Sequence, residues 1–156
     1  MFTIYINDLP SACENIYLFA DDAKMFKIIK CPDDLKSMQL NVINMQNWLN
    51  VWRMIPNVDK CCVLKFGNKY NNIYEMWDSA QVKQVIQVVK VIKDLGVFVD
   101  DKLTFRDHIY SKVKLANTML GIINRHFRLI DEEAYLCFYK GLVIPHLEYA
   151  VQVWCP

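Results

Sequence analysis

Two adjacent carboxylates, Asp21 and Asp22, lie between two short runs of strand-forming residues and constrain the fold more than any other feature. The apolar run Ile16–Phe19 precedes them after Ala20, and the run Ala23–Ile28 follows directly. This pattern predicts a tight hairpin with both acids at its tip. Two-residue hairpin turns favour Asn-Gly or Asp-Gly, because these residues accept positive φ. Asp-Asp departs from that preference and supplies the oxygen ligands that hard divalent cations use.

The rest of the first hundred residues predicts one long helix and further strands. Pro32–Asp34 is typical of a helix start, with an Asp at the N-cap, and Pro56 is expected to stop the helix. Strands are predicted over 61–66 and over 84–92, the second leading to Gly96. The apolar residues of the long helix recur at steps of three and four and predict a buried stripe: Leu35, Met38, Val42, Met45, Leu49 and Trp52.

The remainder of the chain predicts helices. Thr104 with Asp107 resembles a capping box at the start of a helix that runs to about Phe127. Asp131–Glu133 predicts the start of another helix, which Pro145 should kink or break. The fold class expected from this order is α+β. The change of character near residue 103 predicts two domains, residues 1–103 and residues 104–156.

The charge of the whole chain is nearly balanced, at +1, but one segment is basic. Between residues 102 and 128, Asp107 is the single acid. Such a local excess of positive charge could follow a phosphate backbone, and it could equally be the solvated face of a helix. The basic residues of this segment are Lys102, Arg106, Lys112, Lys114, Arg125 and Arg128.

Cysteine spacing and hydropathy indicate an intracellular protein, without separating nucleus from cytoplasm. The six cysteines contain no Cys-x-x-Cys pair, which disulfide scaffolds and zinc ribbons need. Free thiols in a reducing compartment are therefore expected. No segment has the length and apolarity of a membrane span, and the N-terminus does not read as a signal peptide.

Several segments, in the same order along the chain, resemble the reverse transcriptases of non-LTR (LINE-type, jockey-like) retrotransposons. Phe-Ala-Asp-Asp is similar to the double-Asp motif of the palm, and Asn57–Lys60 is similar to the Asn-x-x-Lys segment of that family. The resemblance continues almost to the last residue. The matching segments are Ile4–Pro10, Phe19–Asp22, Asn57–Gly67, Lys93–Val97 with Asp101–Ile109, Leu120–Arg125 and Leu142–Ala150.

The resemblance implies a partial palm, with an antiparallel sheet, the Asp-Asp hairpin and one long helix, followed by a helical thumb. Asp21 and Asp22 would be catalytic metal ligands for Mg²⁺, and Lys60 would be a general acid toward the leaving pyrophosphate. An acidic turn without metal and an exposed strand-edge lysine are the alternatives. Leu95 and Gly96 match the turn that supports the primer terminus, although Gly96 could simply allow close approach of a neighbouring strand. The basic segment would contact nucleic acid.

The resemblance also implies what this chain would lack. In the family, a further metal-binding Asp and a segment that shapes the nucleotide pocket precede the double Asp, so the chain resembles a C-terminal palm and thumb fragment. The implied activity is RNA-directed DNA polymerisation, with an RNA template, a DNA primer and dNTP as partners. The isolated chain is expected to be truncated and inactive. The alternative is a non-enzymatic retrotransposon remnant that binds nucleic acid weakly. No membrane partner is expected, and the oligomeric state is left open.

Overall fold

The computed structural model describes residues 6–67, 70, 73–78, 82–127 and 129–155. The chain divides into two compact units. Unit 1 comprises Met1–Val63 and Asn68–Val88, and unit 2 comprises Leu64–Gly67 and Val89–Pro156. The described strands form four separate pairs, namely β1 with β2, β3 with β6, β4 with β5, and β7 with β8. The α+β class is confirmed, but the strands do not form one continuous sheet.

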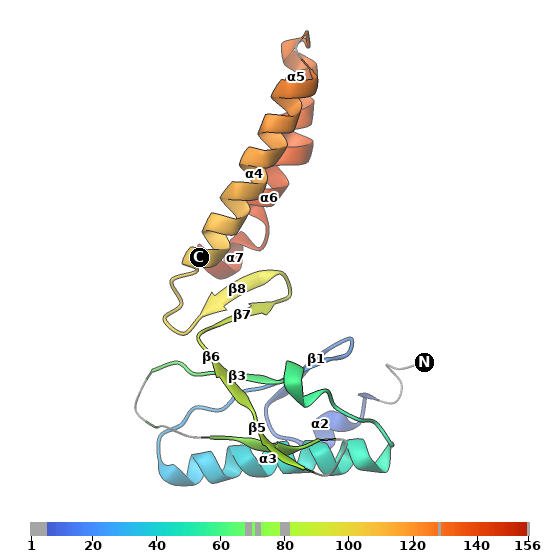
Figure 1. Cartoon of the computed structure of the whole chain (residues 1–156), viewed down its shortest axis with the longest axis vertical. Helices are drawn as coiled ribbons and strands as arrows, with labels where there is room; N and C mark the ends of the chain where they lie inside the picture. Colours follow the sequence, from blue (N-terminus) through green and yellow to red (C-terminus); the bar gives the residue numbers. More distant parts are fainter. Residues whose placement is uncertain (1–5, 68–69, 71–72, 79–81, 128, 156) are drawn as a thin grey trace. The chain divides into compact units, whose positions relative to one another are not determined.

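Unit 1 is built around one long helix, α3, which packs along α2 and β4 (Figure 1). Buried Val42 on α3 meets Tyr74, Met76 and Ile86 in one cluster, and Trp48 meets the residues of α2 in another. The elements are α2 (Leu9–Ala12), β1 (Ile16–Phe19), β2 (Asp22–Met25), α3 (Pro32–Val51), the 3-10 helix η1 (Val58–Lys60), β3 (Cys62–Leu64), β4 (Glu75–Trp77), β5 (Lys83–Val85) and β6 (Gln87–Val89).

The expected long helix is present, with two corrections at its ends. Its N-cap is Cys31 rather than an Asp. The carboxylate of Asp34 accepts the backbone N–H groups of Cys31 at 3.0 Å and Lys30 at 2.8 Å, which lowers the pKa of Asp34. At the other end α3 stops at Val51, before Pro56 is reached, and the chain turns through positive φ at Arg53.

Three amide side chains on α3 each bond both backbone groups of one residue outside the helix. The amide of Gln39 donates to the carbonyl of Glu75 at 2.9 Å and accepts its N–H at 3.0 Å. Gln46 bonds both backbone groups of Trp77 in the same way, at 2.8 and 3.2 Å. Asn41 bonds both backbone groups of Glu14, each at 3.3 Å. Each pair of bonds satisfies the donor and the acceptor of one backbone residue.

Unit 2 consists of a hairpin and helices that lie side by side (Figure 1). Buried Ala116 and Ile123 of the long helix pack against Val143. The predicted strand over 84–92 is wrong in extent, because it is divided into β5, β6 and the first part of the hairpin. The elements are β7 (Val91–Asp94), β8 (Val97–Asp100), α4 (Arg106–His126), α5 (Glu132–Phe138), the π-helix η2 (Tyr139–Val143), α6 (Ile144–Glu148) and α7 (Val151–Trp154).

The predicted capping box of Thr104 with Asp107 is also wrong. The N-cap of α4 is Phe105, which has a φ of 53° and makes no side-chain cap bond. Instead, the carboxylate of Asp100 holds the turn before α4, because it accepts backbone N–H groups between Lys102 and Phe105. Asp131 is confirmed as a helix start, because its carboxylate accepts the N–H of Ala134 at 2.7 Å. At Pro145 the helical run is not broken; a π-helical turn, Tyr139–Val143, precedes α6, which begins at Ile144 with Pro145 in its first turn.

Candidate functional site

The double Asp lies where the sequence predicts it, at the tip of a hairpin in unit 1. In the β1–β2 register Phe19 pairs with Asp22, so Ala20 and Asp21 form a two-residue turn. Ala20 takes the positive φ, at 53°, where Gly or Asn is usual. Asp21 and Asp22 are both exposed. The hairpin therefore presents two neighbouring carboxylates to solvent, one in the turn and one at the first position of β2.

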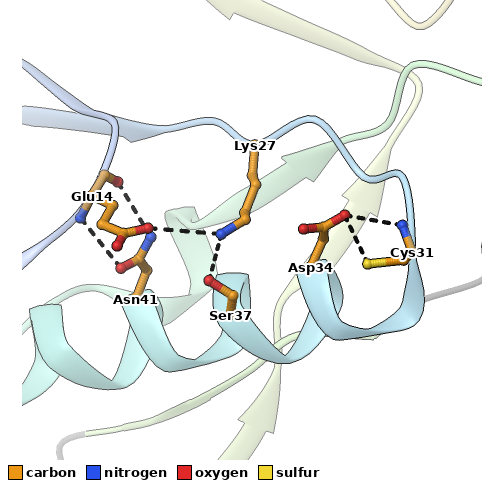
Figure 2. A network of polar contacts seen from close by, with 6 residues as sticks. All are labelled: Glu14, Lys27, Cys31, Asp34, Ser37 and Asn41. Carbon is orange, nitrogen blue, oxygen red and sulfur yellow. Dashed lines mark hydrogen bonds and ion pairs between the residues drawn. The ribbon is translucent and has the colours of Figure 1, made fainter.

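A polar network anchors the base of this hairpin on α3 (Figure 2). Asn41 holds the backbone of Glu14, two residues before β1, as described above. Lys27, just after β2, donates from Nζ to the hydroxyl of Ser37 and lies 3.7 Å from a carboxylate oxygen of Glu14. Both ends of the hairpin are thus fixed on one helix, while its tip with the two carboxylates remains accessible.

The tip offers two carboxylates as ligands for a divalent ion. Carboxylate oxygens are the ligands that Mg²⁺ prefers. Within the described ranges, however, no group of three or more His, Cys, Asp or Glu side chains could hold a metal ion. Asp21 and Asp22 alone leave most positions of an octahedral ion to water or substrate.

Lys60 lies at the end of the 3-10 helix η1, immediately before β3, and it is exposed. Its backbone N–H donates to the carbonyl of Asn57 at 3.1 Å, so the Asn-x-x-Lys segment forms one tight turn. Among the described residues no ion pair joins Lys60 to Asp21 or Asp22. The structure places Lys60 in a short helix rather than at a strand edge.

The predicted primer-support turn lies in unit 2. In the β7–β8 register Asp94 pairs with Val97, so Leu95 and Gly96 form another two-residue turn. Both have positive φ, at 44° and 84°, which is the requirement of a type I′ hairpin turn. The hydroxyl of Tyr149 donates to the carbonyl of Leu95 at 2.7 Å. A Cβ at Gly96 would lie 2.9 Å from that hydroxyl oxygen, so the close approach requires glycine.

The predicted nucleic-acid residues differ in the contacts that they make. Lys114 and Arg125 are both exposed on α4, and eleven residues make about three helical turns, so they lie on one face. Arg106 covers the ring of Tyr110, 5.5 Å from its centroid. Lys112 instead lies 4.2 Å from the ring centroid of Tyr149. Lys102 is exposed in the turn before α4, and Arg128 lies outside the described residues.

Sequence reasoning missed the part of Tyr149, which joins two groups that were predicted separately. Its hydroxyl contacts the Leu95–Gly96 turn, and its ring contacts Lys112. The predicted residues thus fall into two sets: Asp21, Asp22 and Lys60 in unit 1, and the turn with the basic residues in unit 2. Nothing in the sequence around Tyr149 indicates its contacts with Leu95 and Lys112, because both partners are far away along the chain.

Comparison with known proteins finds similarity to a polymerase of a mobile element. The chain is 27% identical over 145 residues to the RNA-directed DNA polymerase from mobile element jockey of Drosophila funebris. The aligned part is 89% of this chain and 15% of the Drosophila protein, so the chain spans a small part of that relative's length. No protein-family model and no solved structure matches the chain. The similarity supports a reverse-transcriptase-like relationship. Separately, no helix within the described ranges is long and apolar enough to cross a membrane.

Proposed function

We propose that this chain is the palm-and-thumb portion of a reverse transcriptase of the non-LTR retrotransposon type. The observation that carries the proposal is the exposed Asp21–Asp22 hairpin, within a chain that is similar over 89% of its length to an RNA-directed DNA polymerase. An RNA template, a DNA primer and dNTP are the partners that follow. Asp21 is the proposed metal ligand, with Asp22 in support.

The remaining roles belong to residues outside the hairpin. Lys60 is the proposed general acid toward pyrophosphate, and its exposure leaves it free to approach a phosphate. Leu95 and Gly96 would support the primer end through their backbone. Lys114 and Arg125 would contact the phosphate backbone from one face of α4. Lys112 is less available for this role, because its ammonium group already covers Tyr149.

This chain alone binds primer–template but does not extend it. Electrostatic stabilisation by preorganised charges and metal ions supplies most of the rate in such reactions, and two exposed carboxylates are too few to organise it. We expect Mg²⁺ to bind at the hairpin with a Kd on the order of millimolar or weaker, since water must fill most of its ligand positions. An NMR titration with Mg²⁺ that moves the amide signals of residues 19–23, and loses this effect in Asp21→Asn, would support the site.

Two assays on the full chain test the function. The first measures binding to an RNA–DNA primer–template with a recessed 3′ end, and we expect tighter binding than to either single strand. Equal affinity for all nucleic acids, or none, would contradict the polymerase assignment. The second measures primer extension with Mg²⁺ and dNTP, by the wild type, Asp21→Asn and the matched surface control Asp33→Asn. Extension by the wild type and by Asp33→Asn, but not by Asp21→Asn, would show a complete active site. It would contradict the proposal that this chain alone does not extend a primer.

The second candidate function is that of a non-enzymatic retrotransposon remnant that binds nucleic acid. The shared face of Lys114 and Arg125 favours it, because that face needs no metal. Each neutralised phosphate contributes a slope of about −0.9 to log K against log salt on B-form duplex. The variant Lys114→Gln/Arg125→Gln should therefore reduce the slope by about 2. If the double variant reduces the salt slope in this way, and the wild type shows no preference for a recessed 3′ end, the remnant is favoured over the polymerase.

A further inference from the structure

Tyr149 makes two contacts with the Leu95–Gly96 turn and is itself held by two more residues. Its hydroxyl donates to the carbonyl of Leu95 at 2.7 Å, across 54 residues of sequence. Its ring lies so close to Gly96 that a Cβ there would be 3.1 Å from Cε1. The ammonium nitrogen of Lys112 lies 4.2 Å from the ring centroid. Its carbonyl accepts the indole N–H of Trp154 at 2.9 Å. The side chain is therefore held at its hydroxyl by Leu95 and over its ring by Lys112, and its backbone carbonyl is held by Trp154.

The turn that Tyr149 holds is one that needs support. Leu95 has a φ of 44°, a conformation that the Cβ of a branched, bulky residue makes unfavourable. Asn or Asp at this position would tolerate the conformation with local hydrogen bonds, but leucine cannot form them. Leu95 is also half exposed, so core packing does not hold it in place. A hydrogen bond from outside the hairpin is the contact that can select this conformation.

The chain around Tyr149 is shaped to make this contact possible. Tyr149 ends α6 with an extended ψ of 120°, and Ala150 follows with a φ of 54° before α7 begins. This sharp break lets one residue leave the helix and reach the hairpin, while the indole of Trp154 returns to hold its carbonyl. Lys112, from the first half of α4, lies over the ring and adds a cation–π attraction.

We infer that Tyr149 is a positioning residue, which fixes the Leu95–Gly96 turn relative to α4, with Lys112 holding its ring in place. The effect on a primer end rests on the proposed function, because only that function makes the turn a support for the primer. If the turn supports a primer end, the hydrogen bond from the Tyr149 hydroxyl keeps the backbone of the turn in one position for that contact. The positively charged Lys112 then acts through Tyr149 rather than by contacting phosphate.

The variant Tyr149→Phe tests the inference with little disturbance, because it removes the hydroxyl and keeps the ring. We expect the amide hydrogens of residues 94–97 to exchange about two- to tenfold faster, as the loss of one net hydrogen bond implies. Exchange within α4 should not change. Tyr139→Phe is the matched control, since the Tyr139 hydroxyl makes no hydrogen bond with another described residue. In Lys112→Met, the same amides should exchange faster by a smaller factor, because the hydroxyl bond remains.

A binding measurement separates positioning from a purely structural role. The readout is the ratio of the affinities for a recessed 3′ end and for a blunt duplex of the same length. We expect Tyr149→Phe to lower this ratio, while Tyr139→Phe leaves it unchanged. Unchanged exchange at residues 94–97 would overturn the inference at its first step. Faster exchange with an unchanged ratio would overturn the role toward the primer. If the wild type binds no nucleic acid, the proposed function fails, and the exchange data still decide whether Tyr149 fixes the turn.

Discussion

His108, at the start of α4, accepts the backbone N–H of Phe98 on its Nδ1 atom at 3.4 Å and is fully buried. The proton of the neutral ring is therefore on Nε2, for which no described residue lies within hydrogen-bond geometry. Trp154 lies beside the ring, with the two centroids 5.8 Å apart. His108 thus joins α4 to β8 through a hydrogen bond that requires its neutral form, and its ring contacts Trp154 of α7.

Stability should fall as the pH is lowered below about 6.5, the ordinary pKa of histidine. Burial lowers the pKa of His108, and the charge of Lys112 lowers it further, although the nearby Tyr149 carbonyl opposes them. Between the unfolded pKa and the lower folded pKa, the unfolded chain binds more protons, so acidification favours unfolding there. Urea unfolding at a series of pH values measures this. The double variant His126→Gln/His146→Gln should keep the effect, and its disappearance in that variant would assign it to the other histidines.

Two glycine substitutions in unit 2 should have opposite effects. Gly96→Ala should lower the free energy of unfolding by about 1–3 kcal/mol, because alanine is strained at positive φ. The new Cβ would also lie 2.9 Å from the Tyr149 hydroxyl oxygen. Gly121 is inside α4 with open space around it, so Gly121→Ala should raise stability by about 0.5–1 kcal/mol. Chemical denaturation of both variants compares them, and a neutral Gly96→Ala would show that the turn is not constrained as described.

The amide contacts from α3 predict a specific loss in unit 1. Gln46→Ala would leave the N–H and C=O of Trp77 without their partners, and we expect a loss of about 1–3 kcal/mol. The adjacent residue Asn47 is exposed on the same helix, so Asn47→Ala should change stability by less than about 0.5 kcal/mol. Thermal unfolding followed by far-UV circular dichroism measures both. Equal effects of the two substitutions would mean that the backbone of β4 finds other partners.

Patterns that depend on local sequence predicted the structure well. The Asp-Asp hairpin, the long helix α3 and the N-cap at Asp131 each follow from neighbouring residues, and each is present. Asp131 succeeds because a capping carboxylate needs only the N–H three residues ahead. The same kind of argument predicts a strand that ends near Gly96, where the β7–β8 turn lies, although it makes the preceding strand one piece.

Contacts between distant segments could not be predicted in the same way. Gln39 and Gln46 read as ordinary polar helix residues, because nothing near them in sequence indicates that Glu75 and Trp77 need partners. Lys112 was grouped with the other basic residues, since charge alone does not show that Tyr149 lies beneath it. The candidate site is therefore predictable in its residue types, while the contacts that position it depend on tertiary structure.

Asp100 provides the last prediction, because it replaces the expected capping box. Its carboxylate accepts the backbone N–H groups of Lys102 at 3.0 Å, Thr104 at 3.0 Å and Phe105 at 2.7 Å. It also accepts the Thr104 hydroxyl at 3.1 Å. These bonds hold the turn that leads from β8 into α4, and Asp100→Ala should lower the Tm by several degrees. Asp101→Ala, one residue later, is the matched control.

The effect of Asp100 should also depend on pH in a defined direction. Hydrogen bonds from the backbone, that of Thr104 foremost, lower the pKa of Asp100 in the folded chain. The stabilisation by Asp100 is therefore complete above the unfolded pKa of about 3.9 and is lost as the pH falls through the lower folded value. The difference in Tm between the wild type and Asp100→Ala should accordingly be constant near neutral pH and shrink in strong acid. A difference that persists unchanged in acid would show that the ionised carboxylate is not what holds the turn.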